Sequence, residues 1–130
     1  MARFTLRKDQ KLKSSKLIDR LFSEGASVTA FPLKLLFVEA PLPKQVQLQV
    51  GFSVPKRNFK LAVTRNRLKR LLREAYRLNE PLFFNKTETS YAFMFLYLAK
   101  EERDFQQLNE AMQQLLQAFL NKITHEEKND

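Results

Sequence analysis

The segment at residues 91–98, YAFMFLYL, constrains the fold most, because it holds no charged residue and is apolar at odd and even positions alike. Successive side chains of a strand point to opposite faces, so this pattern predicts a strand covered on both sides, as central parallel strands are. The run is too short to cross a membrane as a helix, which needs about 18 apolar residues. Other parts of the chain must therefore pack against both of its faces.

An amphipathic helix is predicted at residues 61–78. At about 100° per residue its apolar side chains fall within an arc of roughly 100°; they are Leu61, Leu68, Leu71, Leu72 and Ala75. The opposite side is polar and mostly basic, and it consists of Arg65, Asn66, Lys69, Arg70, Arg73 and Arg77, with Arg67 and Glu74 on a border. Asn58 and Thr64 are the candidates to cap the start of this helix.

Two more helices are predicted from caps and periodicity. Ser14 or Ser15 is suited to cap a short helix that stops at Gly25. Asp104 is suited to cap a last helix whose apolar residues recur at helical spacing as far as residue 123.

The strands complete an α+β pattern. We expect long strands at 33–40 and 46–54, a short edge strand at 28–31 and a turn at 41–44. The order α-β-β-β-α-β-α predicts a two-layer α/β sandwich. Because the helix at 61–78 joins two strands, it predicts a parallel β-α-β unit, for which general statistics favour a right-handed crossover.

The chain of 130 residues suits one domain. We expect this domain to span residues 1–123, of which residues 1–13 form a basic arm. Residues 124–130 have no apolar residue, so we expect a disordered tail there. The absence of cysteine and of an apolar signal segment predicts a reduced cytoplasmic protein.

The charge is strongly uneven. Lys and Arg number 23 against 14 Asp and Glu, a net charge of +9. Residues 56–77 hold nine basic residues and one acidic residue, which makes +8, and residues 1–20 hold seven and two, which makes +5. The remainder of the chain is balanced or mildly acidic. Such clustering indicates one charged face for a polyanionic partner, either nucleic acid or an anionic membrane.

Several classes of active site are excluded by composition. With no cysteine and only His125, neither a Ser-His-Asp triad nor a multi-histidine zinc site can be built. With two glycines, Gly25 and Gly51, neither a Walker loop nor a dinucleotide-binding turn can form. The sequence therefore favours a binding role over catalysis by protein side chains.

The basic helix face fits RNA. Arg65, Lys69 and Arg73 follow one another one turn apart, so they repel each other unless phosphates neutralise them. Asn66 among them is able to bond a base edge or a 2′-hydroxyl group. The alternative is a solvated helix face with no partner. The aromatic residues Phe22, Phe37 and Phe52 are open to two interpretations as well, as core residues or as rings that stack on unpaired bases.

Two stretches closely resemble the bacterial ribonuclease P protein subunit. They are QVGFSVPKR at residues 49–57 and AVTRNRLKRLLREAYR at residues 62–77, which carry the strand motif and the Arg-Asn-Arg box of that family. The resemblance covers residues 3–123. Two departures occur: Asn58-Phe59-Lys60 forms a link one residue longer than usual and lacks its glycine, and Ile18 replaces an aromatic residue of the first helix.

The resemblance implies a fold, a function and partners. The family fold has a left-handed β-α-β crossover. The family protein assists a catalytic RNA that removes the 5′ leader from precursor tRNA, and the RNA, which holds most of the Mg²⁺, performs the hydrolysis. The implied partners are the catalytic RNA and precursor tRNA with a single-stranded leader. We expect no catalytic residue, no metal bound by the protein alone, no membrane partner, and a monomer in the absence of RNA.

The resemblance also implies two sets of site residues. The set expected to bind RNA consists of Lys56, Arg57, Arg65, Asn66, Arg67, Lys69, Arg70 and Arg73. The set expected to line a leader-binding cleft between the first helix and the sheet consists of Phe22, Ser27, Leu35, Phe37 and Ser53. The placement of Leu35 and Phe37 depends on a one-residue choice of alignment.

Three other functions compete with this one. A ribosomal or RNA-chaperone protein has the same composition and is separated only by the Arg-Asn-Arg box. A DNA-binding helix would require a helix-turn-helix partner, which the sequence does not suggest. A membrane-surface helix would need the apolar face that the core requires.

Overall fold

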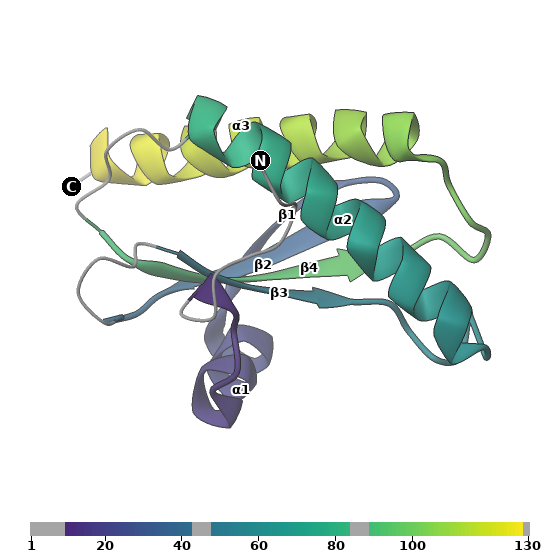
Figure 1. Ribbon diagram of the computed structural model, residues 1–130. Coiled ribbons are helices and arrows are strands. Elements are labelled where there is room, and N and C mark those ends of the chain that lie inside the picture. Colours follow the sequence, from purple (N-terminus) through teal and green to yellow (C-terminus); the bar gives the residue numbers. More distant parts are fainter. Residues whose placement is uncertain (1–9, 43–47, 84–88, 129–130) are drawn as a thin grey trace, which may run out of the picture.

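The computed structural model describes residues 10–42, 48–83 and 89–128, and Figure 1 shows a sheet with helices on both faces. Helices α2 and α3 cover one face, and the shorter α1 crosses the other. The predicted element order is confirmed, and the elements are α1 (Ser15–Glu24), β1 (Ala26–Ala30), β2 (Leu33–Glu39), β3 (Leu48–Ser53), α2 (Ala62–Phe83), β4 (Tyr91–Tyr97) and α3 (Phe105–Lys128).

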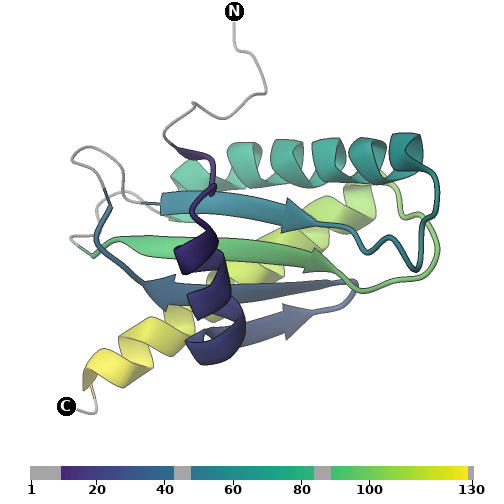
Figure 2. The ribbon, with the colours of Figure 1, turned by 90° about the horizontal axis from the view of Figure 1, so that it is seen from below.

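The sheet is mixed, with the strand order β1-β2-β4-β3. The apolar strand β4 lies inside the sheet as predicted, antiparallel to β2 and parallel to β3. Viewed from the α1 side in Figure 2, β3 lies above β4, both run to the right and α2 lies behind, so this crossover is left-handed. A right-handed crossover would carry α2 to the face of α1 and away from α3, against which it packs.

The odd residues of β4 form the main core with α2 and α3. Phe93, Phe95 and Tyr97 are fully buried there. The Phe119 ring of α3 lies 4.9 Å from the Phe93 ring and 4.8 Å from the Phe37 ring of β2, edge to face in both cases. Such aromatic pairs stabilise a core beyond their buried area.

The even residues of β4 face α1. Ala92 and Met94 form a second, smaller cluster with Leu36 of β2 and Leu21 of α1. Leu12 packs against the same cluster, and its N–H donates to the Val50 carbonyl of β3 at 3.1 Å. The end of the expected basic arm is thus attached to the sheet edge, whereas residues 1–9 lie outside the described residues, as do residues 43–47 in and after the predicted turn.

Two of the predicted helix caps are confirmed. The Ser14 hydroxyl accepts from the Leu17 N–H at 3.3 Å, and the Asp104 carboxylate accepts from the Gln107 N–H at 2.9 Å. Gly25 ends α1 in extended backbone. A Cβ atom at Gly25 would collide with the Leu21 carbonyl. Glycine is therefore required here because the backbone passes close to that carbonyl, and not because of a left-handed turn.

The helix ends differ from the predictions in three places. Helix α2 begins at Ala62, which puts Leu61 in the N-cap position, so neither Asn58 nor Thr64 caps it. The same helix runs on to Phe83, through Pro81. Helix α3 continues to Lys128, so residues 124–128 are helical and the expected tail is wrong there. Once a helix has formed, each added residue gains a hydrogen bond without needing an apolar contact.

Candidate RNA-binding interface

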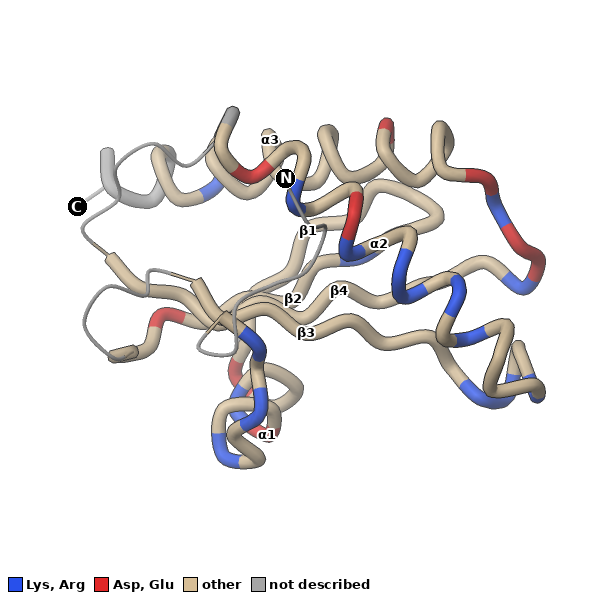
Figure 3. Tube along the Cα trace, in the orientation of Figure 1, with Lys and Arg blue, Asp and Glu red and all other residues tan. Residues whose placement is uncertain are grey.

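The basic residues gather on the first half of α2 and on the link before it, as Figure 3 shows. Lys56 and Arg57 lie in the turn after β3, and both are exposed. On α2, Asn66, Arg67 and Arg70 are exposed, while Lys69 and Arg73 are partly buried. All eight residues of the predicted RNA-binding set, including Arg65, therefore lie in one continuous part of the molecule, which we call the basic region.

The link between β3 and α2 has a defined conformation. The N–H groups of Asn58 and Phe59 both donate to the Pro55 carbonyl at 3.2 Å. The Phe59 ring is buried edge-on against Tyr97, with 5.6 Å between the ring centres. The extra residue and the missing glycine are thus accommodated by a turn anchored in the core.

Three of the arginines contact other parts of the protein. One terminal nitrogen of Arg65, Nη1, donates to the Phe59 carbonyl at 2.8 Å and to the Lys60 carbonyl at 3.0 Å. Arg67 pairs with Glu102. Arg73 lies 5.9 Å from the centre of the Phe52 ring, within reach of a cation–π contact. These arginines are more constrained than the exposed cations Lys56, Arg57 and Arg70.

Leu61 and Val63 differ from the expected helix pattern. The helical pattern predicts Leu61 on the buried arc, but the residue is 66% exposed, because it precedes the first helical turn. Val63 is 68% exposed. Two apolar side chains therefore lie in solvent next to the basic residues.

The two flanks of α1 present different residues. Leu21 points to the sheet and is 1% exposed. Arg20 and Phe22 lie about 100° to either side of it on the helix, so they border opposite flanks. Phe22 is 59% exposed. Most of the Phe22 ring is therefore accessible to solvent at the flank of α1.

Ser27 and Ser53 lie on the sheet face that α1 crosses. Ser27 pairs with Leu36 of β2, and Ser53 pairs with Leu96 of β4. Partners in register share a face, and Leu36 and Leu96 belong to the cluster beneath α1. Both serines are partly exposed, as the predicted cleft requires.

Leu35 and Phe37 lie on the opposite face, so their prediction as cleft residues is wrong. Both are buried in the main core beneath α3. In a strand a shift of one residue exchanges the two faces, so the cleft positions of β2 are Lys34 and Leu36. Lys34 is the one charged residue at residues 33–38, which is a signal that the even positions face the more open side.

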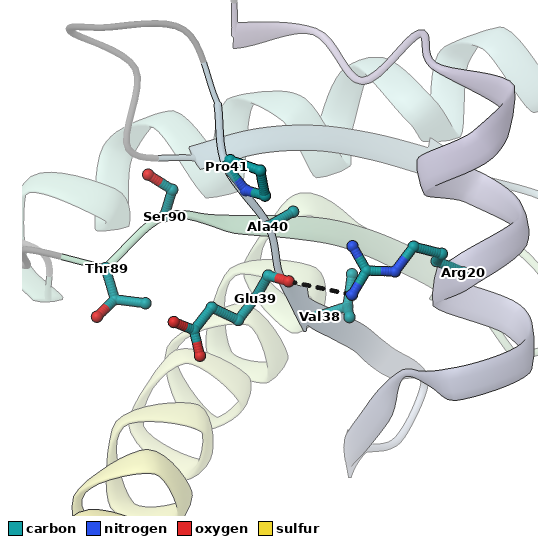
Figure 4. A pocket seen from close by; sticks show the side chains of 7 residues that line it. All are labelled: Arg20, Val38, Glu39, Ala40, Pro41, Thr89 and Ser90. Atoms are coloured by element: carbon teal, nitrogen blue, oxygen red, sulfur yellow. Dashed lines mark hydrogen bonds between the residues drawn. The ribbon is translucent and has the colours of Figure 1, made fainter.

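A solvent-open pocket of about 670 Å³ lies on the Arg20 flank of α1 (Figure 4). Arg20 donates across it to the Glu39 carbonyl at 3.3 Å and pairs with Glu24 at the same distance. The remaining lining residues are Val38, Ala40, Pro41, Thr89 and Ser90. None of these residues belongs to the predicted site sets, and none forms part of a recognisable motif.

Among the side chains that the structure describes, those of residues 10–42, 48–81 and 89–124, no group of three or more His, Cys, Asp or Glu could hold a metal ion. The basic region would also repel a divalent cation. The described side chains thus offer no carboxylate cluster of the kind that holds a divalent ion by protein groups alone. None of the helices in residues 10–42, 48–83 and 89–128 is long and apolar enough to cross a membrane.

The chain is similar to known proteins over most of its length. The sequence model of the family described as Ribonuclease P matches residues 6–120. The ribonuclease P protein component of Porphyromonas gingivalis is 33% identical over 118 residues, which cover 88% of this chain and 86% of that protein. The corresponding protein of Chlorobium phaeobacteroides is 42% identical over 83 residues, which cover 62% of this chain and 57% of that one.

Solved structures show the same fold. The RNase P protein of Staphylococcus aureus aligns with a TM-score of 0.68 at 18% identity, covering 85% of this chain and 95% of that chain. The RNase P protein from Thermotoga maritima aligns with a TM-score of 0.66 at 23% identity, covering 82% and 94%. Motif, fold and sequence likeness agree, and the chain belongs to the family of bacterial ribonuclease P protein components.

Proposed function

We propose that this chain, as the protein component of ribonuclease P in tRNA 5′ processing, binds the catalytic RNA through the basic region and the precursor-tRNA leader through the sheet face beside α1. The observation that carries the proposal is the collection of cations on α2 and its preceding link. In this proposal the protein supplies no catalytic residue, and the catalytic RNA cleaves the phosphodiester bond.

The basic region suits a folded RNA. Lys56, Arg57 and Arg70 are exposed cations on one side of the molecule. Each cation that meets a phosphate releases a counterion, so affinity falls steeply with salt. The exposed amide of Asn66 lies among them and is able to bond a 2′-hydroxyl group.

The sheet face beside α1 suits a single strand. Phe22 offers an exposed ring for stacking on a base. Lys34 offers a cation for a phosphate, and the Ser27 and Ser53 hydroxyls offer hydrogen bonds on the same face. Leu96, partly exposed on the same face, offers apolar surface. This set replaces the one that included Leu35 and Phe37.

The basic region also bears on Mg²⁺. Phosphates brought together by two RNAs repel each other, and protein cations nearby lower that repulsion. The two RNAs can then approach closely enough for their own groups to form a metal site, and we propose that this approach favours Mg²⁺ occupancy in the complex, with the ion held by RNA. We also propose a cytoplasmic protein that is monomeric without RNA and has no membrane partner.

Cleavage of precursor tRNA tests the proposal. At low Mg²⁺, the protein mixed with a bacterial ribonuclease P RNA should stimulate cleavage at the mature 5′ end, and the protein alone should leave the substrate intact. Arg70→Ala should reduce the slope of log affinity against log salt by about 0.7–0.9, whereas Gln114→Ala on the exposed side of α3 should not. Stimulation without any salt-slope change in Arg70→Ala would move the RNA site away from α2.

A further inference from the structure

Arg65 differs from the other cations of the basic region in the direction of its bonds. Both contacts of its Nη1 atom are to carbonyl oxygens of the link, those of Phe59 and Lys60, at 2.8 and 3.0 Å. Charge-assisted bonds of this kind are stronger than neutral ones. The side chain is partly buried, whereas Arg67 and Arg70 on the same helix are exposed.

Arg65 lies at the start of α2, where its two carbonyl bonds have an electrostatic role. Its backbone N–H forms the first hydrogen bond of α2, to the Leu61 carbonyl at 3.2 Å. The helix dipole opposes a positive charge near the start of α2, and the first turn holds no acidic residue to offset this cost. The two carbonyl bonds offset this cost, and they join the helix start to the link.

The segment between β3 and α2 carries three exposed cations, Lys56, Arg57 and Lys60. Lys56 and Arg57 lie in the turn that is closed by the Asn58 and Phe59 N–H groups on the Pro55 carbonyl. The Phe59 ring packs on Tyr97 in the core, and the Phe59 carbonyl accepts a hydrogen bond from Arg65 of α2. Together these contacts fix where the turn stands relative to α2.

We infer that Arg65 is a positioning residue, which acts by fastening the link to α2 so that Lys56 and Arg57 meet the RNA together with Asn66 and Arg70. The part of the inference that concerns RNA binding rests on the proposed function, but the attachment of the link to α2 is measurable without RNA. The inference gives the Arg-Asn-Arg box two roles: Arg65 holds the link in place, and the other residues contact the RNA.

Hydrogen exchange on the free protein tests the fastening. Arg65→Ala should speed exchange at the Asn58, Phe59 and Arg65 amides while leaving the melting temperature nearly unchanged. Arg70→Ala is the matched control, since it removes the same charge from the same helix, and it should leave these amides protected. Unchanged exchange in Arg65→Ala overturns the inference, and this outcome says nothing against RNA binding by α2.

Affinity for ribonuclease P RNA, measured across salt concentrations, tests how Arg65 acts. Arg65→Ala should reduce the slope through Lys56 and Arg57, whose phosphate contacts are lost when the turn is displaced, so this reduction should disappear when both of these residues are already alanine. Arg70→Ala should reduce the slope by about 0.7–0.9 whether or not Lys56 and Arg57 are present. A slope reduction by Arg65→Ala that is as large without Lys56 and Arg57 as with them overturns the inference.

A double-mutant cycle provides the last readout. If Arg65 acts through the link, Arg65→Ala and Arg57→Ala should be non-additive in RNA affinity, because the second change finds its cation already displaced. Arg70→Ala and Arg57→Ala should be close to additive. Additivity in both pairs would make Arg65 an independent contact and overturn the inference.

Discussion

The two faces of the sheet differ in how completely helices cover them. Beneath α2 and α3, Phe93, Phe95 and Tyr97 have no exposed surface. On the other face α1 crosses the strands and buries Ala92 and Met94, but leaves Leu96 and Ser53 partly exposed (Figure 2). A closed face stabilises the fold, and a half-covered face offers a ligand both apolar surface and polar groups.

Truncation in the closed face should have the largest effect. Phe37→Ala removes a ring that packs edge to face on Phe119, and it should lower the free energy of unfolding by about 3–5 kcal/mol. Urea denaturation measures this loss. Should the variant keep its stability and lose affinity only for leader-bearing tRNA, Phe37 would belong to the leader site after all.

Truncation beneath α1 should have a smaller and more local effect. Leu21→Ala removes the fully buried side chain of α1 and should cost about 2–3 kcal/mol. Because α1 is held by a small cluster, hydrogen exchange should accelerate in α1 and remain slow in α3. Equal acceleration in both helices would mean that the two faces unfold as one unit.

The exposed ring on the open face should matter for binding alone. Phe22→Ala should leave the melting temperature nearly unchanged, because the ring is mostly in solvent. Affinity for precursor tRNA should fall by about 1–3 kcal/mol per stacked base, and leaderless tRNA should bind as before. An equal loss for both RNAs would place Phe22 outside the leader site.

A charge at the margin of the closed face should give the smallest effect. Burial raises the pKa of the half-buried Glu80 above its ordinary 4.5, so ionisation costs stability once the pH exceeds that value. Glu80→Gln should therefore raise the melting temperature slightly at pH 7. The advantage should vanish below pH 4.5, where Glu80 is protonated in both states. A variant that is less stable at pH 7 would show that the carboxylate has a favourable partner.

Much of the fold was predictable from local patterns. The caps at Ser14 and Asp104 are local hydrogen bonds, and the apolar run at 91–98 needs cover on both faces wherever it lies. The basic half of α2 was also predictable, because charge and periodicity coincide there. These features depend on neighbours in the sequence, which is why sequence reasoning found them.

The candidate site was less predictable where it depends on register. Leu35 and Phe37 differ from Lys34 and Leu36 by one position, and both pairs are plausible in a strand with few polar residues. The pairing of β2 with β4 decides which of them lies beneath α1. The role of Arg65 was likewise hidden, because its carbonyl partners are set by the conformation of the link.

Three features follow from the amino-acid sequence alone: the order of the elements, the concentration of positive charge on α2 and the family resemblance through the Arg-Asn-Arg box. Three others depend on how the chain packs: the hand of the crossover, the face to which each β2 side chain turns and the difference between Arg65 and Arg70. The two groups differ in the range of the interactions behind them, because propensity, capping and periodicity act over a few residues, whereas register and packing depend on strands and helices that meet from distant parts of the chain.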